Sequence, residues 1–293
     1  MDWSYIVSNA LTLACIYGTL AIGLSICWSS LGLINMAYGF IFAFSGYGAW
    51  LASTYLSEHG VVVMAAGILA GALCGVLVCL IAFIPIHDKP NFTLRGMIAT
   101  LAISLIGSQV LLWSFGSRSK ALPEIFGYGR FEFAGIVFTA GRLGSIISSI
   151  ALLVIVLRWM RSSRRGLEIR AMMMNPHAAS IVGIGVRRTS IYVMALTGGL
   201  AGLAAVLLSQ TYYVSPFSGL TPMIKGLSVA LCGGLGSVTG AVIAAILLGI
   251  NEALTANLWG GQYVLITQFL LIIIILLIRP RGIAGILDRA REA

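Results

Sequence analysis

The chain has 293 residues, of which 59% are hydrophobic and only 9% are charged, and its mean hydropathy is +1.01. About 25% of the residues of an ordinary soluble domain are charged. The composition of this chain therefore excludes a soluble globular domain. The net charge of +9 does not indicate nucleic acid as a partner, because long apolar runs separate the basic residues. The sequence therefore predicts an all-α polytopic membrane protein, in which residues 1–293 form a single transmembrane domain.

Two apolar segments of different character are expected at the start of the chain. Residues 5–57 contain no charged residue and no histidine, which leaves room for two crossings of about 20 residues each. Residues 5–28 are predicted to form a plain span. Residues 31–57 are interrupted by one asparagine and several glycines, namely Gly32, Asn35, Gly39, Gly46 and Gly48. Such a segment is tolerated at membrane depth only where its freed backbone groups are buried in protein or face a cavity, so a broken or re-entrant helix is predicted.

Residues 61–84 and 96–115 are predicted to be the next two spans, joined by a short polar loop after Pro85. In the second of them, four polar residues recur near helical spacing: Thr100, Ser104, Ser108 and Gln109. This polar stripe is expected to face neighbouring helices, because lipid offers it no hydrogen-bond partner. Residues 116–142 are predicted to form an external loop with a short hairpin. The span at 143–157 is so short that Arg142 and Arg158 are expected to snorkel at its two ends.

Residues 158–188 form the longest polar interruption, and they contain seven arginines against one acid, Glu168. Arginine clusters beside membrane spans mark the cytoplasmic side. With this loop inside, the cytoplasmic segments carry thirteen basic and five acidic residues, whereas the other side carries five basic and four acidic ones. Both termini are accordingly expected on the cytoplasmic side.

Two short helices are expected within the loop. Good helix formers follow Gly166 and end before Asn175, which is predicted to cap a second helix that has Pro176 in its first position. Gly183 and Gly185 are expected to end that helix. Three exposed methionines at 172–174 indicate an adaptable contact surface for another protein. The alternative is a loop that lies on the lipid headgroups with its apolar side down.

The second half of the chain repeats the pattern of the first. A span at 189–210 and an aromatic, proline-containing loop at 211–222 precede an apolar segment at 223–249 that is again interrupted by glycines, and residues 260–278 form a plain final span. The sequences from Gly46 to Ala49 and from Gly234 to Ser237 are loosely alike. About eight transmembrane segments in duplicated halves are therefore predicted, and the paired broken segments indicate a transport route.

The sequence contains no motif from which the chain itself can draw energy. It has neither a G-x-x-x-x-G-K phosphate loop nor an H-E-x-x-H metal motif. Glu58 and Glu252 are placed at the outer ends of apolar segments, and Lys225 is expected to snorkel outward. All five cysteines lie in apolar stretches without C-x-x-C spacing and are interpreted as small buried hydrophobes. A route without catalytic activity or a metal, driven by another protein, is the resulting prediction.

The loop and the broken segments together resemble the membrane subunits of bacterial ABC importers for branched-chain and other hydrophobic amino acids, the LivH type. The resembling residues occur in order over nearly the whole chain: 32–39, 98–100, Gly107, Gly166, 170–171, Asn175, 178–179, 183–184, Gly226, 233–234, 236–237, 240–241 and 279–282. Where such chains commonly read Asn-Phe-Ala-His-Gly-Glu, residues 35–40 read Asn-Met-Ala-Tyr-Gly-Phe, which is more apolar. Hydrophobic cargo fits this change better than urea or a short amide.

The resemblance implies a permease subunit that forms a translocation path with a homologous partner permease. It also implies two cytosolic ATPase subunits that use ATP and magnesium, an external solute-binding protein, a place in the lipid of the bacterial inner membrane, and no cofactor bound by this chain. The residues assigned to the path are Asn35, Tyr38, Gly39, Gln109, Gly233, Gly234 and Gly236. Those assigned to contact with an ATPase are Glu168, Arg170, Ala171, Met172, Met173, Met174, Asn175 and His177.

Alternatives stay open for the residues and for the function. Asn35 could equally line a path or only form hydrogen bonds with freed backbone carbonyls. Tyr38 and Gln109 could instead form hydrogen bonds between helices. The assigned glycines suit kinks and close packing. An ABC permease for urea, short amides or small organic acids is a further possibility. A passive channel or ion-coupled carrier is another, and there the arginine loop would be only a topological anchor.

Overall fold

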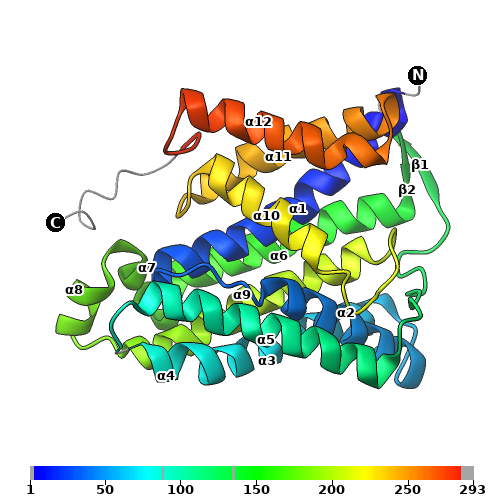
Figure 1. Ribbon diagram of the computed structural model, residues 1–293. Coiled ribbons are helices and arrows are strands. Elements are labelled where there is room, and N and C mark those ends of the chain that lie inside the picture. The colour runs from blue at the N-terminus through cyan, green and yellow to red at the C-terminus, as the bar shows by residue number, and fades with distance from the viewer. Residues whose placement is uncertain (1–2, 88, 134–135, 285–293) are drawn as a thin grey trace. The chain divides into compact units, whose positions relative to one another are not determined.

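The computed structural model describes residues 3–87, 89–133 and 136–284, and most of this part is helical, as predicted (Figure 1). The helices are α1 (Trp3–Leu31), α2 (Tyr38–Tyr55), α3 (Gly60–Val78), α4 (Ile84–Ile86), α5 (Phe92–Phe115), α6 (Ala140–Ser162), α7 (Arg164–Met174), α8 (Pro176–Ile181), α9 (Val186–Leu208), α10 (Leu220–Gly233), α11 (Val238–Leu258) and α12 (Val264–Ile278). The two ends of the chain, 1–2 and 285–293, lie outside the described residues.

Seven helices in the described part are long and apolar enough to cross a membrane. They are α1, the continuous run Gly60–Ile86, α5, α6, α9, α11 and the run Gly261–Ile278, which includes α12. Two more apolar helices, α2 and α10, adjoin the glycine-rich breaks and are not among these seven. The prediction of a polytopic helical protein with about eight segments, two of them broken, is confirmed.

Glycines mark the points at which both broken segments are interrupted. Between α1 and α2, residues 32–37 are not helical and Gly32 has φ 70°. Between α10 and α11, Gly234 and Gly236 both have φ 93°. Residues other than glycine rarely adopt this left-handed backbone conformation, so these three glycines determine where the helices stop.

The likeness between residues 46–49 and 234–237 does not reflect equivalent structure. Gly46 and Gly48 lie inside α2, not at its break. A Cβ on Gly46 would be 3.1 Å from Cγ1 of Val214, and one on Gly48 would be 2.6 Å from the Cβ of Ala70. The first pair of glycines therefore permits close packing, whereas the second pair permits a turn.

The chain forms two compact units, each assembled from separate stretches. The α2–α3–α9 unit consists of residues 26–125 and 152–223, and the α11–α12 unit consists of the described residues of 1–25, 126–151 and 224–293. Boundaries between the units fall inside α1, α6 and α10. In the second unit, α11 and α12 lie side by side (Figure 1).

Backbone-to-backbone packing between α3 and α9 forms the centre of the α2–α3–α9 unit, and α2 packs against both. Gly67 and Gly71 on α3 face Gly202 and Gly198 on α9, and a Cβ on any of the four would overlap backbone of the opposite helix or a packed side chain. Small residues spaced by four allow membrane helices to approach this closely, where van der Waals contact replaces the hydrophobic effect. The contact thus depends on the absence of side chains.

A π-helical turn, Cys79–Phe83, joins α3 to α4. Pro85 follows directly, and it has no N–H and clashes with the carbonyl four residues earlier, that of Ile81. Widening the helix by one residue accommodates that clash. The sequence prediction of a span ending near Pro85 is confirmed.

Helix α6 corrects one prediction and the hairpin confirms another. The span expected at 143–157 is a helix of 23 residues, so Arg142 and Arg158 lie within it. Arg142 is tied to α1: its Nη1 donates to Ser8 Oγ at 2.7 Å, and its guanidinium lies 4.3 Å from the ring centre of Tyr5. Strands β1 (Arg130–Phe133) and β2 (Ile136–Thr139) form the expected antiparallel hairpin.

The contact between α3 and α9 predicts a large difference between two adjacent glycines. Gly198→Ala would place its methyl group on the carbonyl of Gly71, and overpacking of this kind costs about 1–3 kcal/mol. Gly199→Ala is the matched control, because its Cβ would lie 3.5 Å from Cγ2 of Ile68, an ordinary contact. Thermal unfolding in detergent should show a lower melting temperature for the first variant only. Equal melting temperatures would contradict the close approach of the two helices.

Candidate functional site

Asn35 lies in the first break and Tyr38 begins α2, and both are fully buried within the α2–α3–α9 unit. The Asn35 Oδ1 accepts the backbone N–H of Ala37 at 3.0 Å, and its Nδ2 lies 3.6 Å from the sulfur of Met194. The Tyr38 hydroxyl donates to the carbonyl of Thr197 at 3.1 Å. These contacts attach the break to α9, so both side chains act as ties between elements of this unit.

Two further residues hold the same break in place. The backbone N–H of Met36 donates to Thr100 Oγ1 on α5 at 3.1 Å. Gly39 packs on the backbone of Gly219, because a Cβ added to it would lie 3.0 Å from that carbonyl oxygen. The break is therefore fixed from several sides, and each freed polar group named here has a partner within the unit.

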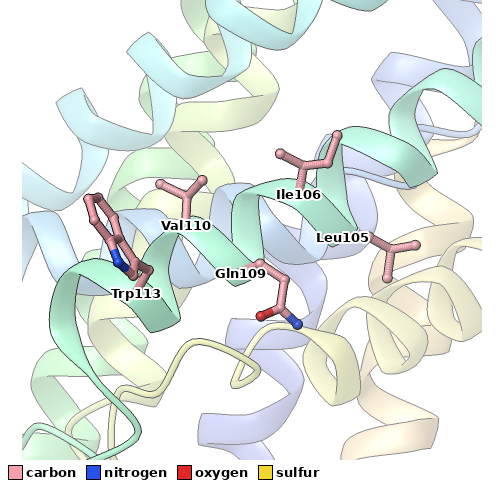
Figure 2. A pocket seen from close by; sticks show the side chains of 5 residues that line it. All are labelled: Leu105, Ile106, Gln109, Val110 and Trp113. Carbon is pink, nitrogen blue, oxygen red and sulfur yellow. The ribbon is translucent and has the colours of Figure 1, made fainter.

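Gln109 departs from the stripe of polar residues predicted on α5. Thr100 and Ser104 are buried, as expected, but Gln109 is exposed on the opposite face of the helix. There it borders a hollow of about 410 Å³ whose other lining residues are Leu105, Ile106, Val110 and Trp113, all from α5 (Figure 2). The hollow is open, since one helix supplies every lining residue, and it combines one amide with four apolar side chains.

Gly233, Gly234 and Gly236 form the turn between α10 and α11 in the α11–α12 unit. Gly233 packs directly on the backbone of Gly240, and the Gly236 N–H donates to Ser25 Oγ at 2.8 Å. The freed carbonyls at the end of α10 are also paired: Cys232 accepts from the N–H of Ile283 at 2.8 Å. The turn is thus closed by α1, α11 and the segment after α12.

The contact between the segment after α12 and the end of α10 gives a structural role to the Arg-Pro-Arg-Gly motif, which the sequence alone only matched to a family. In the Arg-Pro-Arg-Gly run at 279–282, Gly282 has φ 78°, and a Cβ on it would lie 2.5 Å from the backbone nitrogen of Gly234. Ala284 then donates its N–H to the carbonyl of Gly233 at 3.1 Å. The motif turns the chain so that it caps α10.

The predicted contact residues for an ATPase lie on α7 and α8. Ser163 Oγ caps α7 by accepting the Gly166 N–H at 2.9 Å. Asn175 caps α8, accepting the N–H groups of His177 and Ala178 at 3.0 Å each. The two-helix loop and its asparagine cap are therefore confirmed.

The prediction that all three methionines at 172–174 are exposed is wrong. Met172 is 1% exposed, Met173 is half-buried, and Met174 is 78% exposed. The reason is the helical period: Gly166, Ile169 and Met172, three residues apart, form the buried face of α7. Of the remaining predicted residues, Ala171 is half-buried and His177 is exposed.

Glu168 and Arg170 make contacts inside the chain. The Glu168 carboxylate accepts from Arg165 Nη1 at 3.1 Å and from Thr189 Oγ1 at 3.5 Å. Arg165 also lies over the ring of Tyr192 at 5.0 Å. Arg170 Nη2 donates to the carbonyl of Arg161 at 3.4 Å, and its Nε is buried without a partner. The contacts of Glu168 and Arg165 hold α7 against the start of α9, and that of Arg170 holds it against the end of α6.

A buried ion pair in the α11–α12 unit was missed. Lys225 does not snorkel outward and Glu252 does not lie at an exposed end: they are 8% and 5% exposed, and their Nζ and Oε1 atoms are 2.6 Å apart. Tyr17, 2% exposed, bonds both. One signal was available, namely a lone base and a lone acid left in neighbouring apolar segments, because such residues usually pair within a membrane.

Comparison with known proteins shows which family the sequence matches. Residues 6–278 match the family described as branched-chain amino acid transport system, permease component. The high-affinity branched-chain amino acid transport system permease LivH of Escherichia coli strain K12 is 29% identical, over 94% of this chain and 94% of that protein. A probable branched-chain amino acid transport permease LivH of Methanocaldococcus jannaschii is 30% identical, over 98% of this chain and 92% of that protein.

A solved structure supports the fold. PsaBC from Streptococcus pneumoniae, in complex with a Fab, superposes with a TM-score of 0.52 at 14% identity, covering 94% of this chain and 93% of that one. At this identity the likeness concerns the fold alone. The family match spans both breaks, α5 and the α7–α8 loop. The chain is therefore a member of the family of permease components of branched-chain amino acid transport systems.

Proposed function

We propose that the chain forms, together with a homologous permease, the translocation path of an ABC importer for branched-chain or other hydrophobic amino acids. Separate ATPase subunits use ATP and magnesium to drive it, and an external solute-binding protein delivers the cargo. The observation that carries this proposal is the family match over residues 6–278, which includes every residue assigned to the path and to coupling. The chain itself is then a membrane permease that binds no cofactor.

The exposed face of α5 supports a path beside Gln109. An amide that faces hydrocarbon lacks hydrogen-bond partners, and that costs free energy. A wet path or a second permease against this face removes the cost. The four apolar side chains around Gln109 suit an aliphatic cargo better than urea or a short amide.

The α7–α8 loop supports coupling to an ATPase. Large apolar side chains are exposed on it: Leu167, Met174, Ile181 and Val182 are 58%, 78%, 74% and 75% exposed. The burial of Met172 and the hydrogen bond of Glu168 with Thr189 make the loop a firm part of its unit. A firmly held element with an exposed apolar tip is suited to transmit movement from a partner protein. The alternative, contact with lipid headgroups, gives no role to the ATP-driven partner.

Substituting Met174 tests the coupling contact. Met174→Asp places a charge on the exposed tip of α7 without touching the buried face, so the fold and the amount of protein should not change. If the methionine is buried against an ATPase, the variant should weaken that association by about 2 kcal/mol, or roughly thirtyfold. ATP-dependent uptake and copurification of the ATPase measure this effect.

Leu94→Asp is the matched control. Leu94 is 60% exposed in the first turn of α5 and lies outside the α7–α8 loop, so uptake should stay near the wild-type rate. Normal uptake and normal copurification with Met174→Asp would exclude the proposed contact. Uptake that continues without ATP would favour a channel or an ion-coupled carrier.

Gln109→Leu tests the path. It removes the single amide from the hollow on α5 while preserving size, so the loss of one hydrogen bond to passing cargo or water should slow uptake roughly fivefold, equivalent to about 1 kcal/mol. Val110→Leu is the control, because it leaves the hollow apolar at the same place. ATPase copurification should be normal in both. Equal uptake by both variants would remove Gln109 from the path.

The cargo assignment is tested separately. Leucine, isoleucine and valine should stimulate the ATPase activity of the assembled importer when added with the cognate solute-binding protein, whereas urea, acetamide and small organic acids should not. This difference between the two groups of compounds is expected because burial of an aliphatic side chain in the apolar hollow is favourable. Stimulation by urea with none by leucine would overturn the assignment.

A further inference from the structure

Three helices of the α11–α12 unit meet at one lysine. Lys225 on α10 contacts Glu252 on α11 and Tyr17 on α1: its Nζ lies 2.6 Å from Glu252 Oε1 and 3.1 Å from the Tyr17 hydroxyl. The Tyr17 hydroxyl in turn donates to Glu252 Oε1 at 3.2 Å. The three contacts close a triangle, so the separation of any one helix breaks two of them.

This cluster lies inside apolar helices and away from their ends. At a rise of about 1.5 Å per residue, Glu252 is roughly 9 Å from the end of α11 at Leu258 and roughly 21 Å from its start at Val238. An unpaired charge at such a place is costly, whereas the pair is neutral as a whole. Neither charge can therefore leave the other without a penalty.

Adhesion alone does not explain an ion pair here. Apolar side chains of similar volume hold buried surfaces together as well as an ion pair does, or better. What an ion pair adds is one preferred arrangement, because its strength depends on short distances and fixed directions. Apolar surfaces, in contrast, tolerate sliding.

Helix α10 also makes close contacts through two glycines. Gly226 packs on α1, where a Cβ would lie 3.0 Å from the Cβ of Leu20, and Gly233 packs on the backbone of Gly240 on α11. Such smooth contacts provide closeness but no directional bond. The Lys225–Glu252–Tyr17 triangle adds directional side-chain bonds to the hydrogen bonds that Ile283 and Ala284 donate at the end of α10.

We propose that Lys225, Glu252 and Tyr17 form a clasp that holds α10 in one position on α1 and α11 throughout the transport cycle. These three are positioning residues: they act through α10 and its glycine turn, and they do not contact cargo. The inference extends the proposed function, because α10 leads into Gly233, Gly234 and Gly236, which are assigned to the path. With the clasp closed, α1, α10 and α11 move as one body.

The test compares four variants of the full chain in lipid nanodiscs and in the assembled importer. Lys225→Met and Glu252→Gln each leave the partner charge alone, the exchanged pair Lys225→Glu with Glu252→Lys restores opposite charges, and Tyr17→Phe removes only the hydroxyl. Lys120→Met is the control, because Lys120 lies over the ring of Trp50 and has no ion pair among the residues that the structure describes. Hydrogen exchange of the α10 amides and the kinetics of ATP-dependent uptake are measured.

The single charge variants should raise hydrogen exchange in α10 at least about tenfold and lower the maximal uptake rate at least about tenfold, with the KM for cargo changed less than about twofold. The exchanged pair should return both quantities to within about threefold of wild type, and Tyr17→Phe should change them only about twofold to threefold. The control should match wild type.

Four results would each overturn the clasp. They are wild-type hydrogen exchange of α10 in the single variants, no recovery in the exchanged pair, an effect of Tyr17→Phe as large as that of Glu252→Gln, and a raised KM at an unchanged maximal rate, which indicates direct contact with cargo. If a single variant fails to fold, the exchanged pair and Tyr17→Phe still decide. Hydrogen exchange needs no cargo, so a wild-type importer that takes up no amino acid would refute the proposed function alone.

Discussion

Pairing of backbone polar groups away from water is the constraint on which this structure depends. A helix that stops at membrane depth frees N–H and carbonyl groups, and lipid offers them no partner. At the first break side chains provide partners, as Thr100 does for the N–H of Met36. At the second break the chain itself does so, because the N–H groups of Ile283 and Ala284 return to carbonyls at the end of α10. Each break therefore exists only together with a distant segment that completes it.

Close packing without side chains follows from the same constraint. Where lipid competes equally for apolar surface, helices gain stability by close approach, and Gly71 and Gly198 bring the backbones of α3 and α9 into contact. Such an interface is smooth. Directional bonds then help to fix the register of helices, as the bond from Tyr38 to α9 and the bonds from Lys225 to α1 and α11 do. Glycine determines how near the helices lie, and buried polar side chains determine in which arrangement.

Local features of the fold were predictable from the sequence, and distant pairings were not. The cap at Asn175 and the turn glycines Gly234 and Gly236 depend on neighbouring residues, so their chemistry can be recognised in a short window. The burial of Met172 was also within reach, because Gly166 and Ile169 precede it at helical spacing. The pairing of Lys225 with Glu252 joins residues 27 positions apart on separate helices, and no local pattern encodes that contact. The same limit applies to Gln109. Whether it is buried or exposed depends on which side of α5 packs against the first break, and that side cannot be told from α5 alone.

The ion pair also bears on the source of energy. A carrier driven by protons or sodium needs an acid that takes up and releases a cation in each cycle. Glu252 is the one acid within the spans that the structure describes, and Lys225 and Tyr17 already occupy its Oε1. An acid that already pairs with a lysine is poorly suited to that exchange, since breaking the pair would leave both groups unpaired in an apolar surrounding. This supports the proposal that energy enters from outside the spans, through the exposed tip of α7, and not with an ion that crosses with the cargo.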